Sequence, residues 1–404
     1  MARGRYPLHL RLFLSVARPH INLQQNEDDQ MIFLSYVSED RDRVEPYYEL
    51  LKNHGHDPWM DSKNILGGQN WDYEIRLALD RSEIIIVFVS EQSVDKKGYA
   101  QREIALAVNK SEEKLVGDIY IIPIQLDDGD YPYLLKGIQF LQANKGDVAD
   151  ALLASVDQAN GNAEKQAQVA QTKSEVRWHT SEATSSYNGI PGYETRIQKI
   201  SLSSSKYPDA AEISEHVNGA LVGHAMDARQ AALTPAPDIF NLLQDKWKRT
   251  NTFDGIIDTV STVGRVISIK YSLHWYYGGA AHPTHAPKTF NYLLEPVSVI
   301  RGARTIFQDD EALGVLQRET EKSLAESLYK NNCNIGDLKW IREGTKDWDS
   351  FSNFGFTEEG LVFQFSSYQV ACYAVGMPVA TVGYDKVLPH MTDTFVYALN
   401  RYRA

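Results

Sequence analysis

The feature that most constrains the fold is a run of six apolar residues, IIIVFV at Ile84–Val89. A strand that is apolar at every position has no solvent face, so it belongs inside a sheet that is covered on both sides. Less uniformly apolar segments lie before and after it, separated by helical patterns, at residues 31–37, 58–61, 119–126 and 138–141. The alternation of strand and helix predicts a flavodoxin-like, parallel five-stranded sheet of the α/β class.

Sheets of this class bind ligands beyond the C-terminal ends of their strands. Three segments are predicted at that edge: Ser35 and Tyr36, the loop 65–71 with Gly67, Gly68 and Trp71, and Ser90 with the helix that follows it. That helix carries Tyr99 and Glu103, four residues apart and therefore on one face. Taken alone, such a pair is more often a packed aromatic ring beside a solvated carboxylate than a site.

Charge and cysteine content narrow the class of protein. The chain of 404 residues has 41 Lys and Arg against 53 Asp and Glu, a net charge of −12. An acidic chain is not expected to bind nucleic acid through a broad basic surface. The two cysteines, Cys333 and Cys372, form no close pair, which favours a reducing, cytoplasmic location. No stretch approaches the roughly 20 apolar residues of a membrane span.

Residues 1–30 are predicted to be a polar extension. Their start, MARGRYPLHLRLFLSVA, has basic residues and a short apolar patch that His9 and Arg11 interrupt. A secretory signal is one interpretation of this pattern. The other is that Met31, where the folded pattern begins, is the natural start.

Five motifs in residues 31–157 occur in the order and spacing of a Toll/interleukin-1 receptor (TIR) domain. They are FLSYVSED at 33–40, GHDPWMD at 55–61, ILGGQNW at 65–71, IIIVFVS at 84–90 and YAQREIALAV at 99–108. The segment therefore resembles the TIR family, whose members include both scaffolds and NAD-cleaving enzymes. The resemblance implies that Glu103 is the catalytic glutamate and that Tyr99 holds the aromatic position one turn before it. It also implies that the loop 65–71 packs against a neighbouring copy.

The chemistry of NAD⁺ cleavage suits a single carboxylate. Breaking the bond between nicotinamide and ribose builds positive charge on the ribose, as in glycoside cleavage. A nearby carboxylate stabilises that charge. Tyr99 or Trp71 can stack on a ring, and backbone groups at Gly67 and Gly68 can approach phosphates closely. Ser35, Tyr36 and Ser90 are the other predicted substrate contacts. NAD⁺ is the substrate, and neither a cofactor nor a metal is expected.

The rest of the chain is predicted to be a linker and a second domain. Residues 158–175 are rich in Ala, Gln and Asn, as in a flexible tether or a solvated helix. Residues 176–404 mix strand and helix patterns in the manner of an α+β domain with a mainly antiparallel sheet. Strands are expected at 193–203, 259–274, 289–294, 360–365 and 378–382, and helices at 210–229 and 309–330.

The second domain resembles the extracellular domain of lysozyme-sensing anti-sigma factors of the RsiV type. The matching segments are KYPDAAEISEHVNGAL at 206–221, YYGGAAHPTHAPKTFNYLL at 276–294 and FTEEGLVFQFSSYQVACYAVGMPVATVGYDKV at 356–387. These motifs are structural. They imply a sensor that binds a protein or a cell-wall-related trigger, and lysozyme binding itself is not carried over.

His274, His282 and His285 are close in sequence, so a metal site is one interpretation. No carboxylate or thiolate with ligand spacing accompanies them, and packed or turn-forming histidines are the more common alternative. Cys372 is expected in the core.

Two functions remain open at this point. In the first, the chain is a bacterial anti-phage defence effector that self-associates through its TIR domain and cleaves NAD⁺ to ADP-ribose or a cyclic isomer, under control of the second domain. In the second, it is a non-enzymatic adaptor that signals through TIR–TIR assembly. A secreted virulence factor is a further alternative, supported only by the N-terminus.

Overall fold

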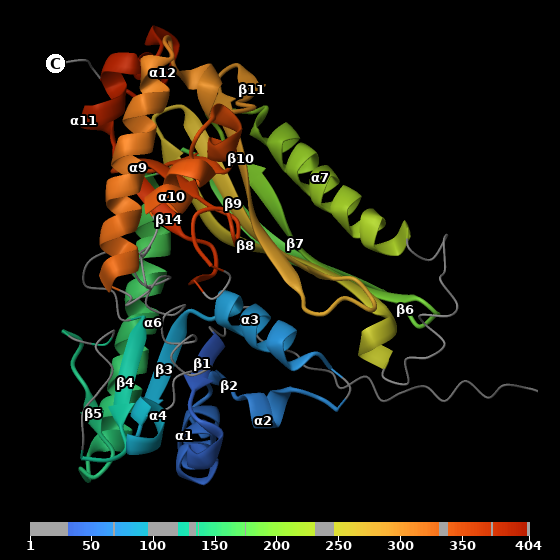
Figure 1. Ribbon diagram of the computed structural model, residues 1–404, viewed down its shortest axis with the longest axis vertical. Coiled ribbons are helices and arrows are strands. Elements are labelled where there is room, and N and C mark those ends of the chain that lie inside the picture. The colour runs from blue at the N-terminus through green and yellow to red at the C-terminus, as the bar shows by residue number, and fades with distance from the viewer. Residues whose placement is uncertain are drawn as a thin grey trace, which may run out of the picture.

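The computed structural model describes residues 31–67, 69–95, 120–128, 135, 137–173, 175–230, 246–330, 338–372 and 375–401. Three predicted site residues, Gly68, Tyr99 and Glu103, lie outside these ranges, as does Cys333. The chain forms an N-terminal α/β domain, a six-stranded sheet and a C-terminal lobe built on a three-stranded sheet (Figure 1).

The N-terminal sheet has the strand order β2-β1-β3-β4-β5, and all of its strands are parallel. This confirms the predicted five-stranded parallel sheet. Its strands are β1 (Met31–Ser35), β2 (Asp57–Trp59), β3 (Ile84–Val89), β4 (Ile121–Gln125) and β5 (Leu141–Gln142). Its described helices are η1 (Ser38–Asp40), α1 (Arg41–Asn53), α2 (Asp61–Asn64), α3 (Trp71–Arg81), α4 (Glu91–Asp95) and α6 (Val148–Lys173).

Every residue of β3 is buried, as the continuous apolar run requires. Alternate residues of the central strands face two different cores. One core holds Ile32 and Ile86 under α1 and α6, and the other holds Phe33 and Ile85 under α3. The sheet is therefore covered on both faces.

Some local expectations were wrong. The strand predicted at 58–61 ends at Trp59, because Asp61 begins α2. Helix α1 begins at Arg41, and the hydroxyl of Ser38 before it bonds to Glu39. Gly55 follows α1 and has a φ of +85°, a conformation that favours glycine at the end of a helix. Helix α6 continues to Lys173, so most of the predicted linker is helical.

The six-stranded sheet has the order β11-β10-β9-β8-β7-β6, with β7 and β8 parallel and the other neighbours antiparallel. Its strands are β6 (Arg177–Tyr187), β7 (Gly192–Ser203), β8 (Thr250–Val263), β9 (Val266–Tyr276), β10 (Thr284–Leu294) and β11 (Val297–Val299). The strand-forming sequence at 259–274 belongs to two strands, β8 and β9, because Gly264 turns the chain between them with a φ of +57°. Strand β6 was missed, since its Ser- and Thr-rich sequence is mostly exposed.

The two faces of this sheet are covered differently. Helix α7 (Ala210–Gln230) packs on the face that holds Ile267, Ile269 and Tyr271. On the opposite face, the backbone of Phe356 bonds to Ser268 and Ser261, so the C-terminal lobe lies there.

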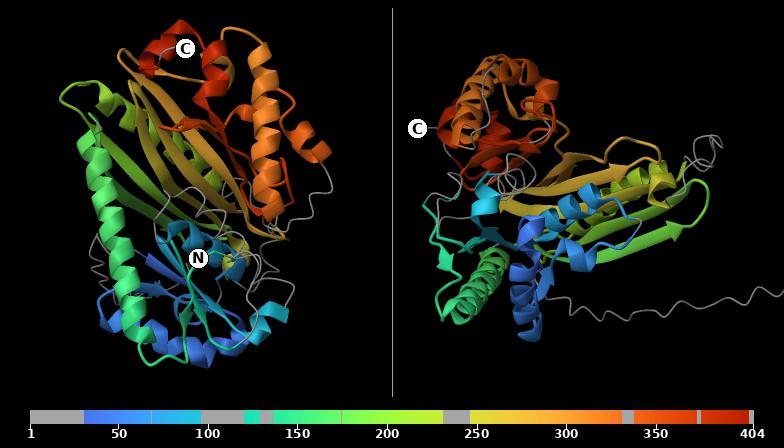
Figure 2. Two further views of the ribbon diagram at one scale, coloured as in Figure 1. Left: turned by 90° about the vertical axis from the view of Figure 1, so that its left-hand side faces the viewer. Right: turned by 60° about the horizontal axis from the view of Figure 1, so that its bottom comes forward.

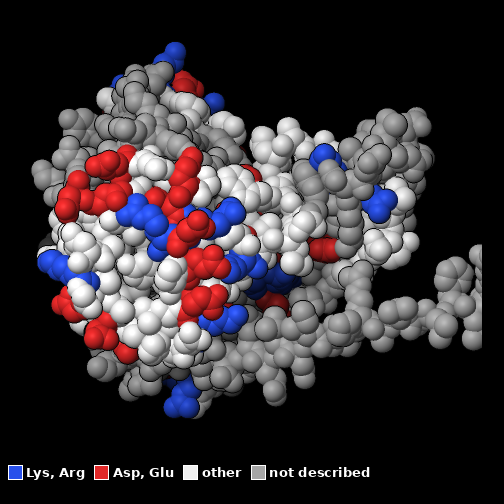
Figure 3. Space-filling model, turned by 90° about the horizontal axis from the view of Figure 1, so that it is seen from below, with Lys and Arg blue, Asp and Glu red and all other residues white. Residues whose placement is uncertain are grey.

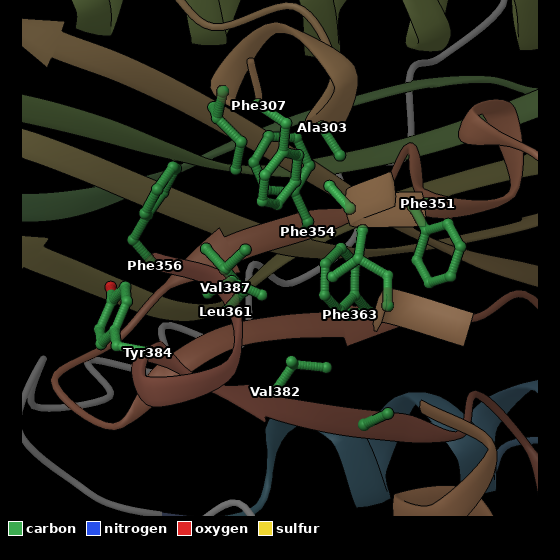
Figure 4. Close-up of a cluster of buried hydrophobic side chains, with 14 of the residues drawn as sticks. Ala303, Phe307, Phe351, Phe354, Phe356, Leu361, Phe363, Val382, Tyr384 and Val387 are labelled. Atoms are coloured by element: carbon green, nitrogen blue, oxygen red, sulfur yellow. The ribbon is translucent and has the colours of Figure 1, made fainter. Parts of the chain in front are cut away.

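The C-terminal lobe contains the sheet β12 (Phe354–Phe356), β13 (Gly360–Gln364) and β14 (Val379–Gly383). Its other elements are η5 (Ala303–Ile306), α9 (Glu311–Lys330), α10 (Leu338–Gly344), η6 (Trp348–Phe351), α11 (Tyr384–Val387), η8 (Leu388–His390) and α12 (Asp393–Ala398). Its core is rich in phenylalanine, with Phe351 and Phe363 meeting edge to face (Figure 4). Cys372 is exposed and not in a strand, so its predicted place in the core is wrong.

Helix α3 connects the N-terminal domain to the rest of the molecule. It lies between the parallel sheet and the six-stranded sheet, where it contacts β8 and β9 (Figures 1 and 2). One helix therefore belongs to two interfaces.

Candidate functional site

The C-terminal ends of the parallel strands are joined by Arg43 on α1. Its guanidinium donates to Asp127 at 2.7 Å, to the carbonyl of Leu126 at 2.7 Å and to Asp40 at 3.2 Å. The Asp127 pair raises the pKa of Arg43, and the same guanidinium lowers the pKa of Asp127. Because Asp40 follows β1 and Asp127 follows β4, this one side chain fixes two strand ends.

The predicted contact Ser90 lies between those ends and is buried. Its hydroxyl donates to Asp40 at 2.5 Å, and its backbone N–H donates to the hydroxyl of Ser93 at 2.9 Å. Asp127 also accepts from the backbone N–H of Glu91, the first residue of α4. The start of the segment that follows β3 is thereby fixed, while Ser90 itself points into the fold. Ser35 is buried as well.

Tyr36 lies at the end of β1 and contacts the neighbouring strand connection. Its hydroxyl donates to Asp61 and lies 3.2 Å from the hydroxyl of Ser62. Burial and the nearby Asp61 carboxylate raise the pKa of Tyr36 to about 12. Tyr36 therefore stays protonated at physiological pH and is a hydrogen-bond donor at this edge.

The loop between α2 and α3 is held at its base and exposed at its tip. Asn70 caps α3 by accepting from the backbone N–H of Tyr73 at 3.2 Å. Gln69 accepts from the backbone N–H of Leu66 at 2.6 Å and donates to Glu74 at 2.8 Å. The loop is thus tied to the first turn of α3. At its tip Leu66 is 69% exposed, and Trp71 is 46% exposed.

Gly67, the described member of the glycine pair, has open space around it, since an added Cβ would meet no atom within 4 Å. The surface at this end of the molecule mixes acidic and basic side chains (Figure 3). The structure thus brings Ser35, Tyr36 and Ser90 to one edge. Gly67 lies on the adjoining loop, and Trp71 is the first residue of α3.

Reasoning from sequence missed Asp40, Arg43 and Asp127. The signal was present in the charged residues that directly follow the strands ending at Ser35 and Gln125.

Of the three histidines weighed as metal ligands, two meet in space. The rings of His274 and His285 stack at 6.0 Å. His282 lies in the turn before β10, where its Nδ1 is 2.9 Å from the carbonyl of Pro283. Within the described ranges, no group of three or more His, Cys, Asp or Glu side chains is arranged to hold a metal ion.

A doubly wound parallel sheet with a polar C-terminal edge, followed by mainly antiparallel sheets, defines the general class of this protein. The family comparison is more specific. A TIR-domain model matches residues 32–156, and a model described as a protein of unknown function, DUF3298, matches residues 304–385. The chain therefore carries a TIR domain followed by a DUF3298 domain. No curated protein matches it.

Solved structures with similarity to the chain fall into the same two groups. A DUF3298-family protein from Bacteroides fragilis is 13% identical, covers 55% of this chain and 97% of its own, and has a TM-score of 0.37. A second, from Pseudomonas aeruginosa, is 13% identical with coverages of 54% and 94% and a TM-score of 0.35. The TIR domain of a Toll-related receptor from Hydra magnipapillata is 19% identical with coverages of 32% and 98% and a TM-score of 0.28. At these TM-scores the structures add nothing to the assignment.

The DUF3298 model carries no functional description, so the predicted sensor role stays a prediction. In the described part of the chain, no helix combines the length and apolar character needed to cross a membrane.

Proposed function

We propose that this protein cleaves NAD⁺ at the bond between nicotinamide and ribose, with Glu103 as the catalytic residue. The observation that carries the proposal is the position of Glu103 in the sequence, after β3 of a TIR domain and one turn beyond the aromatic Tyr99. The TIR family includes NAD-cleaving members, and their catalytic glutamate occupies this position.

The reaction needs little from the protein beyond charge and positioning. The C1′–N bond breaks, its electron pair neutralises the pyridinium nitrogen, and nicotinamide leaves as a neutral molecule. The ribose is left as an oxocarbenium-like cation, which the Glu103 carboxylate stabilises. Water then attacks C1′ and loses a proton to give ADP-ribose, or a nucleophile of the same molecule attacks to give a cyclic isomer.

The described edge of the sheet supports the proposal by its rigidity. Arg43 links the ends of β1 and β4, and Asp127 fixes the first residue of α4, which begins the segment leading to Tyr99 and Glu103. Catalytic groups supported by such hydrogen-bonded networks keep their geometry. Tyr36 adds to this rigidity, because its hydroxyl donates to Asp61 and so ties the end of β1 to the start of α2.

The test is nicotinamide release by the full-length chain. Glu103→Ala should abolish it, and Glu103→Gln should do the same, because the amide keeps the shape but lacks the charge. The proposal fails if, with the second domain displaced from α3, the Glu103 variants release nicotinamide as fast as the chain that keeps Glu103. It also fails if no release occurs even after the second domain has been displaced from α3.

A non-enzymatic adaptor is the second candidate, and the exposed loop tip favours it. Leu66 and Trp71 present apolar surface that a neighbouring TIR domain can cover. Both candidates require self-association, so Leu66→Asp should lower the oligomer mass that light scattering measures once the second domain has been displaced from α3. Only the enzymatic candidate requires Glu103.

We place the activity in bacterial defence against phage, with the second domain as its regulator. The expected sign is a fall in cellular NAD⁺ after infection that Glu103→Ala abolishes.

A further inference from the structure

Helix α3 is buried on two sides, which is unusual for a helix on the outside of an α/β domain. Ile75, Ala78 and Leu79, at helical spacing, belong to the core of the TIR domain. Tyr73 and Leu77 face the other way and pack on Ile256 of β8. All three of these side chains are no more than 5% exposed. We call the contact between α3 and the strands β6–β9 the α3 seam.

Polar pairs join the two domains along the α3 seam. Near the start of the helix, the hydroxyl of Tyr73 donates to the buried carboxylate of Asp254 on β8. At its end, Asp80 lies 2.7 Å from Nε2 of His274 on β9. Arg81 pairs with Glu182 on β6. The seam therefore spans the whole helix.

The apolar part of the α3 seam is small. Among the described residues, the apolar cluster that crosses it consists of Tyr73, Leu77 and Ile256. The other contacts are charged or polar. Small, polar interfaces between domains resemble transient protein–protein contacts, for which relative motion is the default.

Strand β9, which lies under the α3 seam, also has buried polar residues. On β9 the residues facing α7 are apolar, whereas the alternate residues Lys270, Ser272 and His274 are polar and buried. A β-bulge at Asp258 brings a carboxylate to this row, 2.9 Å from the hydroxyl of Ser272. His274 of this row meets α3 at Asp80.

The α3 seam is also linked to the exposed loop 65–71. Tyr73, which bonds to Asp254, is the residue whose backbone N–H is capped by Asn70. Glu74, which accepts a hydrogen bond from Gln69 of the loop, interacts electrostatically with Arg196 on β7. Nε of Arg196 lies in turn 3.7 Å from Asp254. The second domain and the loop therefore share the first turn of α3.

We propose that the α3 seam is an autoinhibitory contact, in which the six-stranded sheet covers the outer face of α3 and keeps TIR domains of different copies from assembling. While the seam is closed, a second copy cannot pack on Tyr73 and Leu77. Release exposes this face and frees the loop that carries Leu66 and Trp71. The inference rests on the proposed function only for its effect on catalysis, since closure and assembly can be measured without any reaction.

A chain of polar contacts extends the α3 seam to the DUF3298 lobe. His274, next to Asp80, stacks on His285, and Nε2 of His285 lies 2.9 Å from the hydroxyl of Ser367. The following residue, Tyr368, has a φ of +69° and is exposed. A ligand that moves this turn would therefore act on the seam through two side chains.

The test opens the α3 seam from the side of the second domain, leaving the TIR sequence unchanged. Ile256→Lys places an unpaired charge against Tyr73 and Leu77, which should favour the open form on the order of 100-fold or more. Thr259→Lys is the matched control, since it adds the same charge at an exposed position of the same strand. Amide hydrogen exchange over residues 71–81 reports opening, light scattering reports assembly, and nicotinamide release reports catalysis.

A milder variant guards against misfolding of Ile256→Lys. Glu182→Arg places a third positive charge near Arg81 and Arg196 and should favour opening by about 2–5-fold. The double variant Arg81→Glu/Glu182→Arg restores an opposite pair and should restore exchange close to that of the unaltered chain.

Faster exchange in α3 together with a larger oligomer supports the proposal, whether or not nicotinamide is released. If assembly rises while no variant releases nicotinamide, autoinhibition stands and the proposed enzymatic function fails. Faster exchange without any rise in assembly overturns the proposal. Unchanged exchange in both opening variants also overturns it, because the seam is then a permanent part of the fold.

Discussion

The two faces of α3 are held by different physics. The inner face places Ile75, Ala78 and Leu79 in an apolar core, where burial stabilises without any need for exact pairing. The outer face depends on Tyr73, Asp80 and Arg81 meeting a carboxylate, an imidazole and a second carboxylate. Buried polar pairs are costly to break yet contribute little net stability when intact. The inner face therefore holds α3 in the TIR domain, whereas the outer face can separate from the six-stranded sheet.

The largest expected effect comes from shortening a side chain on the inner face of α3. Leu79→Ala should lower the free energy of unfolding of the TIR domain by about 2–5 kcal/mol, because it leaves a cavity in a closed core. Denaturant unfolding followed by circular dichroism measures this loss. Leu79 belongs to the core of the TIR domain, so exchange at the α3 seam should change only with global stability. A selective opening of the seam in this variant would contradict the separation of the two faces.

A pH titration should affect only the outer face. Burial raises the pKa of Asp254 from 3.8 to about 7, so the closed seam holds a proton that the open form releases. Closure is then most favoured at low pH and weakens as the pH rises towards 7, by at most about 1.4 kcal/mol per unit. Above about pH 7 the free energy of closure should no longer change with pH through Asp254.

The charged and titratable groups around Asp254 are Tyr73 on α3, Arg196 on β7 and His274 on β9. Burial and the neighbouring His274 lower the pKa of His285 to about 3, so His285 stays neutral throughout. Small-angle X-ray scattering between pH 5.5 and 8.5 should show a more extended molecule at high pH. Asp254→Asn should remove most of that dependence, and an unchanged titration in Asp254→Asn would assign it to another group.

Removing one hydroxyl should give a smaller effect. Tyr73→Phe keeps the ring on Ile256 but leaves Asp254 without its donor on α3, which should weaken closure by about 1–1.5 kcal/mol. Hydrogen exchange over residues 71–81 should rise accordingly. Tyr48→Phe, on α1 and away from the seam, is the matched control. Equal exchange in the two variants would show that the Tyr73 hydroxyl does not hold the domains together.

The difference between the two faces of α3 also explains which parts of the structure could be predicted from the sequence. The parallel sheet was predictable because β3 is apolar throughout and the strands alternate with helices. The α3 seam was not predicted, although Tyr73, Leu77 and Leu79 make α3 apolar on more than one side, as in a helix buried all round. Nothing local pairs Tyr73 with Asp254 or Asp80 with His274, because contacts across nearly two hundred residues depend on how the domains dock. Strand β6 was missed for a related reason, as it is held by β7 and not by a buried face of its own.

The smallest expected effect lies farthest from α3, at Ser367. Its hydroxyl contacts His285 at 2.9 Å and donates to the carbonyl of Gly376 at 3.0 Å, so Ser367→Ala removes a neutral contact worth about 0.5–1.5 kcal/mol. If His285 transmits the change, exchange over residues 71–81 should rise by less than in Tyr73→Phe, and the rise should disappear in a background where His285 is already Phe. Ser366→Ala is the control at the neighbouring position. A rise of equal size with and without His285 would mean that Ser367 supports only its own turn, and the DUF3298 lobe would then have to reach the seam by another route.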